Sequence, residues 1–306
     1  MVMHRRQFLA STTALAASGV GLSAAGMAWA APGEISTPQS GAVLKLSSQL
    51  GVIPGKSLEE KLEKMKTWGF DAVELPGDIV GKVETYAKAA ANAGLKISAV
   101  CWGSANGALV SEDENRRKDG IQMLKEALSA AGELQSTGVI YVPAFNGQSK
   151  LTNQEIRKVL LDIFPEIGEH AVSVKSRVLL EPLNRKEAFF LRQVADAAAI
   201  CRDVNSPGIC LMGDFYHMYI EEPSDFAAFV AGGPWLHHVH LASRIRVLPG
   251  QDERSFIDGF RGLKWVGYQD YCSFECGVQG DREVEIPKAL AFLRDQWEKA
   301  TLPGVG

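Results

Sequence analysis

Three carboxylate residues and one histidine recur at a regular spacing in the second half of the chain. They are separated by 33, 26 and 35 residues, and they are Glu181, Asp214, His240 and Glu275. Three carboxylates brought together would repel one another and could not all ionise in a partly dry pocket. A divalent cation removes that difficulty, so the set predicts a metal site if the fold gathers it.

The donor types indicate which cation such a site would hold. Three carboxylate groups and one imidazole suit a single hard or borderline ion, with Mn²⁺ favoured and Mg²⁺ or Co²⁺ as close alternatives. Zn²⁺ is a further alternative, although no cysteine thiolate joins the set to favour it. Taken singly, each acid could instead cap a helix or pair with an arginine. Four such residues in register make that simpler explanation much weaker.

Short apolar runs alternate with longer amphipathic segments, and each candidate ligand stands in such a run or just beyond its end. The runs predict eight strands at 43–46, 72–75, 97–100, 139–142, 178–181, 209–212, 236–241 and 271–275. The intervening segments predict helices at 58–68, 83–93, 114–134, 153–174, 193–204, 225–230, 256–266 and 285–298. Ser57 and Thr152 are suited to cap helix starts, and Gly69 and Gly94 to follow helix ends.

This alternation predicts an α/β protein with a single (β/α)8 TIM-barrel domain. The repeat of strand plus helix is about 30 residues, and the candidate ligands are spaced by one such unit. An open doubly wound sheet is the competing fold, but the segment after the first strand, SSQLG, is not its Gly-rich phosphate loop. In a barrel the carboxyl ends of the strands form one mouth, so the four residues are expected to meet there.

The first 30 residues predict an export signal rather than part of the fold. Arg5 and Arg6 precede a weakly hydrophobic Ala/Gly/Ser-rich run, and an A-x-A site ends at Ala30. These features predict export by the twin-arginine route, cleavage after Ala30 and a periplasmic or otherwise exported protein. Residues 31–40 are then a linker and residues 41–300 the barrel. A membrane anchor is the alternative, which the small residues of the run disfavour.

Composition excludes several classes of partner. The formal net charge is −4 and no long run of lysine and arginine is present, which argues against nucleic acid and, after signal removal, against a membrane surface. The five cysteines form no CxxC or zinc-type spacing. Free, buried thiols are therefore expected rather than a disulfide framework.

Further polar residues lie within six positions of a candidate ligand, namely Glu187, His217 and Arg246. An imidazole and a guanidinium beside a metal would orient a polyhydroxylated substrate. The segments EPLNRKE, DFYHMYIEE and HHVHLASRIRVLPG resemble the sugar phosphate isomerase/epimerase superfamily of xylose-isomerase-like barrels. Within it they look most like the ketose 3-epimerases of the tagatose and allulose epimerase group. The resemblance spans roughly residues 43–296.

This resemblance implies roles for individual residues. The metal ligands would be Glu181, Asp214, His240 and Glu275. Glu181 and Glu275 would also be the acid/base pair, His217 and Arg246 would hold substrate hydroxyls, and Glu187 would bond near the reacting carbonyl. The resemblance also implies a small-molecule sugar as substrate and a homodimer or homotetramer as the assembly.

Two further positions qualify the resemblance. Glu74, in the segment AVELPG, occupies a position that is often polar in the superfamily, and we assign it no catalytic role. The loop after Arg246 continues PGQDE, where the family usually has P-G-x-G-x. Since that loop borders the substrate, the identity of the sugar stays open.

The implied chemistry starts from a carbonyl and an adjacent hydroxyl that share one metal ion, which acidifies the C–H between them and stabilises an enediolate. Return of the proton from the opposite face gives epimerisation, and its return to the neighbouring carbon gives aldose–ketose isomerisation. An epimerase or isomerase of an unphosphorylated keto sugar is the first hypothesis. Alternatives are β-elimination on a 3-keto-glycoside, hydroxypyruvate-isomerase-like activity and sugar binding without catalysis. The three-zinc DNA-repair endonucleases of the superfamily need extra histidines, and the chain has none between His4 and His170.

Overall fold

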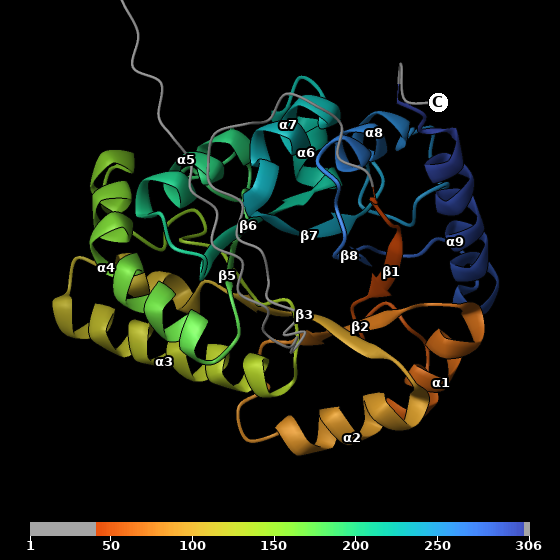
Figure 1. The fold of residues 1–306 in the computed structure, drawn as a ribbon, viewed down its shortest axis with the longest axis horizontal. Coiled ribbons are helices and arrows are strands. Elements are labelled where there is room, and N and C mark those ends of the chain that lie inside the picture. Colours follow the sequence, from red (N-terminus) through yellow and green to blue (C-terminus); the bar gives the residue numbers. More distant parts are fainter. Residues whose placement is uncertain (1–40, 303–306) are drawn as a thin grey trace, which may run out of the picture. The chain divides into compact units, whose positions relative to one another are not determined.

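Eight parallel strands surround a common axis, and helices cover the outside of the ring (Figure 1). The structure is a computed structural model that describes residues 41–302. The strands are β1 (Lys45–Ser48), β2 (Ala72–Pro76), β3 (Lys96–Gly103), β4 (Val139–Tyr141), β5 (Val178–Leu180), β6 (Ile209–Asp214), β7 (Leu236–Leu241) and β8 (Tyr271–Phe274). The predicted TIM-barrel fold is confirmed.

The α-helices follow the strands in the order expected for βα units. They are α1 (Leu58–Trp68), α2 (Val83–Ala93), α3 (Glu114–Glu133), α4 (Asn153–Ser173), α5 (Val194–Val204), α6 (Phe215–Glu221), α7 (Asp225–Gly232), α8 (Ile257–Trp265) and α9 (Arg282–Lys299). The described residues also form the 3₁₀ helices η1 (Ala105–Val110) and η2 (Gly233–Trp235). In the part of the chain that the structure describes, no helix is both long enough and apolar enough to cross a bilayer.

The predicted helix boundaries have the expected chemistry. The Ser57 hydroxyl accepts a hydrogen bond from the backbone of Glu60, and Thr152 and Glu155 form a reciprocal capping box. Gly69 and Gly94 end α1 and α2 in the left-handed region, with φ of 88° and 67°. These conformations favour glycine because it has no Cβ atom.

The ring order is β1-β8-β7-β6-β5-β4-β3-β2, so β1 and β2 are the two ends that must meet to close it. They meet through a single parallel bridge between Gln49 and Glu74 and through a hydrogen bond from Asp71 N to Leu46 O of 2.8 Å. The closure therefore places the side chains of Gln49 and Glu74 next to each other at the barrel mouth.

Two apolar layers hold the barrel together. The outer layer packs strands against helices, and a smaller cluster of residues from β3 to β6 fills the interior, namely Ala99, Ile140, Leu179, Cys210 and Met212. This division follows from the alternation of side chains along each strand. All five cysteines are free, and Cys201, Cys210 and Cys272 are buried.

The structure corrects three details of the predicted elements. The first strand lies two residues later than expected, because Ser47 and Ser48 are buried within the barrel although they are polar. Helix α6 was not expected, since it starts directly at the end of β6 with Asp214 as its N-cap. Strands β5 and β8 end one residue before Glu181 and Glu275, respectively.

The sequence-based predictions for the signal and the linker fall on residues 1–40 and lie outside the described residues. The elements of the barrel run from Lys45 to Lys299.

Candidate active site

The carboxyl ends of four neighbouring strands bring the four predicted ligands together. One ligand atom from each residue lies within 4.8 Å of the others in a group formed by Glu181, Asp214, His240 and Glu275. We call this group the ligand tetrad. Glu181 and Glu275 stand one residue beyond β5 and β8, and their backbone N–H groups still bond to neighbouring strands. The strand ends thereby hold these side chains at the mouth.

Asp214 divides its two carboxylate oxygens between two tasks. Oδ1 accepts a hydrogen bond of 2.6 Å from the backbone N–H of Tyr216 and so caps α6. Oδ2 is buried and has no hydrogen-bond partner within residues 41–302. A free carboxylate oxygen in such a place is costly unless something else compensates it.

His240 presents a second unpartnered atom to the same point. Its Nδ1 is buried without a hydrogen bond among the described residues, and it lies 3.3 Å from Glu275 Oε2 and 3.6 Å from Glu181 Oε1. Its other nitrogen, Nε2, faces away from the tetrad toward Glu74.

The electrostatics of the tetrad reflect crowded negative charge. Burial raises the pKa of Glu181, and burial with repulsion from Glu275 raises the pKa of Asp214 to about 6. Burial opposes ionisation of Glu275 too, but the charges of His240 and Arg246 outweigh it and lower its pKa to about 2. A cation at the tetrad would favour the ionised form of all three carboxylates.

These residues fit a divalent cation. The tetrad offers carboxylate oxygens and one imidazole nitrogen, and two of its atoms, Asp214 Oδ2 and His240 Nδ1, are buried and otherwise unpartnered among the described residues. Hard and borderline ions take such mixed O and N donors. The tetrad is therefore a candidate metal site.

The three residues expected to contact substrate adjoin the tetrad. Arg246 donates from Nη2 to Glu275 Oε2 at 2.7 Å and from Nη1 to Glu187 Oε1 at 3.3 Å. His217 Nε2 lies 3.5 Å from Asp214 Oδ2. The structure thus brings every predicted site residue into one connected group.

Asn184 orients two of these side chains. Its amide Nδ2 lies 2.8 Å from both Glu187 Oε1 and His217 Nδ1, and its backbone N–H lies 3.2 Å from the same imidazole nitrogen. Both of these donors lie closer to Nδ1 than Arg246 Nη1 lies to Nε2, at 3.4 Å, so they favour the His217 tautomer with its hydrogen on Nε2. That hydrogen faces the tetrad, where it can meet a substrate oxygen.

Arg246 adopts a backbone conformation that is uncommon for a side-chain-bearing residue. Its φ is 59°, in the left-handed region, and its guanidinium stacks on the Tyr216 ring at 4.8 Å. Such conformations cluster at functional sites, where the surrounding structure holds them in place. The strained turn aims the guanidinium back over the mouth.

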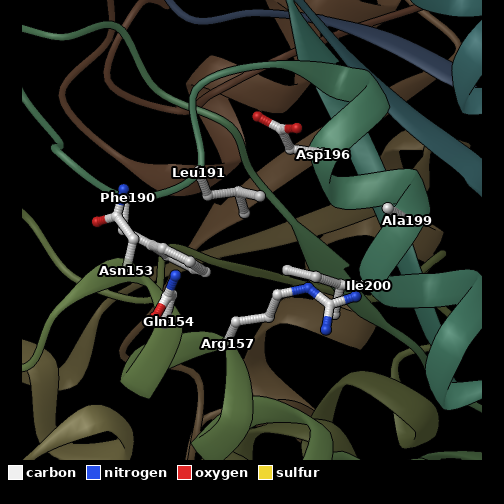
Figure 2. A pocket seen from close by; sticks show the side chains of 8 residues that line it. All are labelled: Asn153, Gln154, Arg157, Phe190, Leu191, Asp196, Ala199 and Ile200. Atoms are coloured by element: carbon white, nitrogen blue, oxygen red, sulfur yellow. The ribbon is translucent and has the colours of Figure 1, made fainter.

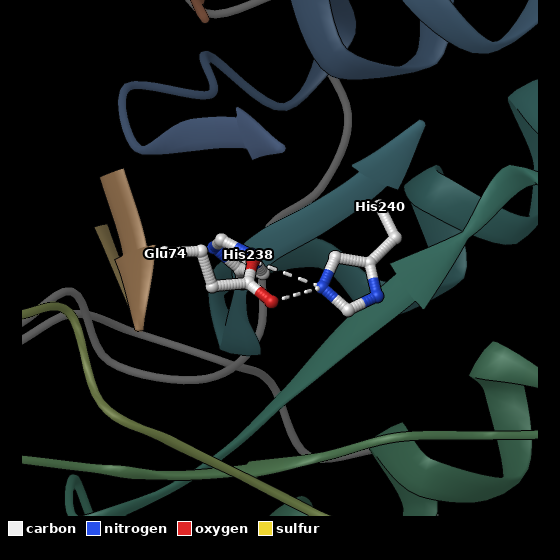
Figure 3. Close-up of side chains that lie close together, drawn as sticks. All are labelled: Glu74, His238 and His240. Atoms are coloured by element: carbon white, nitrogen blue, oxygen red, sulfur yellow. Dashed lines mark hydrogen bonds and ion pairs between the residues drawn. The ribbon is translucent and has the colours of Figure 1, made fainter. Parts of the chain in front are cut away.

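Residues Gln49, Glu74 and His238 contact the tetrad or its neighbours and were not predicted as site residues. Glu74 and His238 are fully buried and bonded to each other at 2.8 Å, and Figure 3 shows them beside His240. The available signals were the glutamate within an apolar strand and the two histidines on one side of β7. Neither signal shows that the glutamate of β2 contacts the histidines of β7, because the two strands are remote in sequence.

A separate pocket of about 250 Å³ lies between α4 and α5 (Figure 2). Its lining includes Arg157 and Asp196 together with the apolar side chains of Phe190, Leu191 and Ile200. None of the predicted site residues lines it. It is therefore a feature of the outer helical layer rather than of the mouth.

Comparison with known proteins gives the family. A family profile described as xylose isomerase-like TIM barrel matches residues 62–296. The chain belongs to this family. The predicted superfamily is thereby confirmed.

Within the xylose isomerase-like TIM barrel family, the chain is similar to sugar epimerases. It is 28% identical to 3-dehydro-D-guloside 4-epimerase of Escherichia coli, over 82% of this chain and 99% of that protein. It is 27% identical to ketose 3-epimerase of Arthrobacter globiformis, over 81% of this chain and 87% of that protein.

A solved structure supports the same relation. The crystal structure of 3-keto-D-glucoside 4-epimerase from Escherichia coli, in its apo form, superposes with a TM-score of 0.76 at 28% identity, covering 83% of this chain and all of that one. The predicted enzyme class, an isomerase or epimerase, is confirmed by these relatives.

Proposed function

We propose that the protein is a metal-dependent epimerase that inverts the carbon next to the carbonyl of an unphosphorylated keto sugar. The names of its relatives support this proposal through a shared chemistry. A 3-dehydro sugar epimerised at C4 and a ketose epimerised at C3 both react at the carbon adjacent to a ketone. That C–H is the one whose acidity the carbonyl raises.

The observation that carries the proposal is the convergence of two carboxylates with different surroundings. Glu275 Oε2 accepts from Arg246 at 2.7 Å and its Oε1 accepts from Gln49 at 3.0 Å, so charged and neutral donors hold it. Glu181 comes from the other side of the tetrad and retains 5% of its surface exposed at the mouth. Two carboxylates that approach from different strands can serve the two faces of one carbon.

The residues then divide the reaction between them. One of Glu181 and Glu275 removes the proton beside the carbonyl, and the other returns a proton to the opposite face of the resulting enediolate. His217 and Arg246 orient the substrate hydroxyls, and Glu187 lies where it can bond near the carbonyl. A divalent cation held by the tetrad would polarise the carbonyl and stabilise the developing negative charge.

The charge balance at the mouth supports a substrate without phosphate. The arginine that contacts the site carboxylates, Arg246, is already paired with both Glu187 and Glu275. A phosphate dianion would meet the tetrad carboxylates and would compete for a guanidinium that is already paired. A neutral polyhydroxylated sugar meets no such penalty.

The twin-arginine segment supports an exported enzyme, in which case oxidised glycosides are accessible substrates. We therefore place a 3-keto-glycoside ahead of a free ketose as substrate. Elimination from a 3-keto-glycoside would begin with removal of the proton at C2, on the other side of the carbonyl, and the resulting enediolate would expel the alcohol at C1. The products must therefore be identified to separate the two reactions.

The test is hydrogen exchange in D₂O with Mn²⁺-loaded protein and either methyl 3-keto-D-glucoside or D-fructose. NMR should find deuterium at the carbon next to the carbonyl and a new epimer of one substrate. Release of methanol would assign elimination instead. Saturable binding of both sugars without exchange would contradict the enzyme proposal and leave a sugar-binding protein.

A further inference from the structure

Glu74 is a fully buried carboxylate that the proposed proton transfers do not use. Within residues 41–302, three side chains donate hydrogen bonds to it. Gln49 Nε2 lies 2.9 Å from Oε1, His238 Nε2 lies 2.8 Å from Oε2, and His240 Nε2 lies 3.0 Å from both oxygens. Burying a carboxylate without donors is costly, and these bonds explain how it is tolerated. Figure 3 shows both oxygens turned toward the same nitrogen of His240.

The contact with His240 determines where the imidazole hydrogen lies. An ionised carboxylate can only accept, so the nitrogen 3.0 Å from both oxygens carries the hydrogen. The amide of Gln49 and the imidazole of His238 also point donors at Glu74, and hydrogen bonds of this kind favour the ionised carboxylate. In the neutral ring the lone pair is then on Nδ1, the atom that faces the tetrad.

Gln49 connects Glu74 to a second member of the ligand tetrad, Glu275. Its one amide nitrogen lies 2.9 Å from Glu74 Oε1 and 3.0 Å from Glu275 Oε1. A primary amide has two hydrogens, so it can donate to both carboxylates at once. The bridge that closes the barrel between Gln49 and Glu74 holds this amide in place.

We propose that Glu74 is the positioning residue of the metal site, orienting His240 directly and Glu275 through Gln49. This inference rests on the proposed metal-dependent function. Outer carboxylates that fix a ligating histidine typically change metal affinity by about 10–100-fold.

The rival explanation is a second cation held by Glu74, His238 and His240, whose ligand atoms also lie within 4.8 Å of one another. The hydrogen bonds argue against it, because a nitrogen that donates its hydrogen to Glu74 has no lone pair for a cation.

The first measurement is calorimetric titration of the metal-free protein with Mn²⁺. The wild type should bind one ion per chain, and Glu74→Gln should bind one ion about 10–100-fold more weakly. Ser98→Ala is the matched control, since it removes a buried bond of 2.7 Å to Ser47 inside the same barrel but none of the hydrogen bonds of Glu74. Its Mn²⁺ affinity should equal that of the wild type.

The second measurement reports the orientation itself. In Zn²⁺-loaded protein with ¹⁵N-labelled histidine, His240 Nε2–H should give a slowly exchanging low-field proton signal. Glu74→Gln should move that signal upfield or lose it to exchange, which loss of stability alone would not do. Gln49→Leu should keep the signal while lowering Mn²⁺ affinity, and it serves as the test if Glu74→Gln does not fold.

The outcomes separate the two proposals. Two ions per wild-type chain, a wild-type proton on His240 Nδ1, or a Glu74→Gln protein that binds Mn²⁺ as tightly as the wild type would overturn the role of Glu74. If Gln49→Leu is the variant tested, an Mn²⁺ affinity equal to that of the wild type would also overturn the role of Glu74. A folded wild type that binds no Mn²⁺ would instead overturn the metal-dependent function.

Discussion

Arg246 Nη2 donates a hydrogen bond of 2.7 Å to Glu275 Oε2. This contact joins a residue expected to hold substrate hydroxyls to one expected to carry a proton. The guanidinium thereby favours the ionised form of Glu275, which a group that accepts a proton requires. Substrate binding and proton transfer are consequently coupled through one ion pair.

Replacement of either proton carrier should separate metal binding from catalysis. Glu181→Gln and Glu275→Gln keep an oxygen donor and the side-chain volume, so Mn²⁺ should still bind. Proton transfer needs the carboxylate, and its loss should slow deuterium exchange by roughly 10²–10⁴-fold. Exchange rates and bound Mn²⁺ are measured on the same samples. Full exchange by both metal-loaded variants would exclude the two-carboxylate mechanism.

Asp214→Asn should weaken the metal site without unfolding α6. Asparagine can still accept the Tyr216 N–H bond and is a good N-cap, but its amide NH₂ then replaces the free oxygen. Mn²⁺ affinity should fall by about 100-fold or more, beyond the effect of an outer-shell change. Activity should recover in part at high Mn²⁺ concentration, while the melting temperature of the metal-free protein changes little. Unchanged affinity would remove Asp214 from the ligands.

His217→Ala and Arg246→Ala should mainly affect the substrate. Each removes a polar contact at the mouth but no member of the tetrad, so bound Mn²⁺ should stay near one per chain. A hydrogen bond to a charged group contributes about 1.5–3 kcal/mol, which corresponds to a rise in KM of roughly 10–100-fold for Arg246→Ala. Steady-state kinetics and metal analysis check this. Loss of the metal with an unchanged KM would contradict it.

Stability should depend on pH through a pair at the amino end of β7, outside the tetrad. His237 Nδ1 lies 2.7 Å from Asp270 Oδ2. Burial alone would lower the pKa of His237, but Cys210 and Asp270 outweigh it and raise that pKa to about 9. The contribution of this pair to the free energy of unfolding should be complete below about pH 6.5, the pKa of histidine in the unfolded chain. It should be lost as the pH rises through 9.

The free energy of unfolding should therefore fall by about 1–3 kcal/mol over this range in the wild type, after allowance for partial exposure of the pair. Asp270→Asn should flatten this part of the profile. Asp295→Asn, which removes a surface pair with Lys299, is the control and should leave it unchanged. Urea titrations at pH 6, 7.5 and 9 provide the measurement. If the free energy of unfolding changes with pH to the same extent in the wild type and in Asp270→Asn, the pair does not cause the pH dependence.

Export should leave a defined N-terminus. The pair Arg5-Arg6 and the site that ends at Ala30 predict a mature chain beginning at Ala31. Mass spectrometry of the native protein should find this terminus in the exported fraction, and Arg5→Lys with Arg6→Lys should abolish its appearance there. A native chain that retains Met1 or Val2 would contradict the prediction.

Much of the fold could be predicted because its signals are local. The apolar runs located all eight strands, and capping residues such as Ser57 and Thr152 located helix starts. The tetrad was also predictable, since Glu181 and its counterparts recur at the spacing of one βα unit. Parallel strands place such positions at one end of the barrel by geometry alone.

Tertiary structure alone decided the partners of these residues. Helix α6 escaped prediction because Asp214 ends a strand and caps a helix with the same side chain. Glu74 meets His240 across 166 residues, and Gln49 meets Glu275 across 226, only because closure of the ring brings β1, β2, β7 and β8 together. The sequence by itself determined which groups reach the mouth. Ring closure, which no local pattern encodes, decided which nitrogen of His240 faces the tetrad.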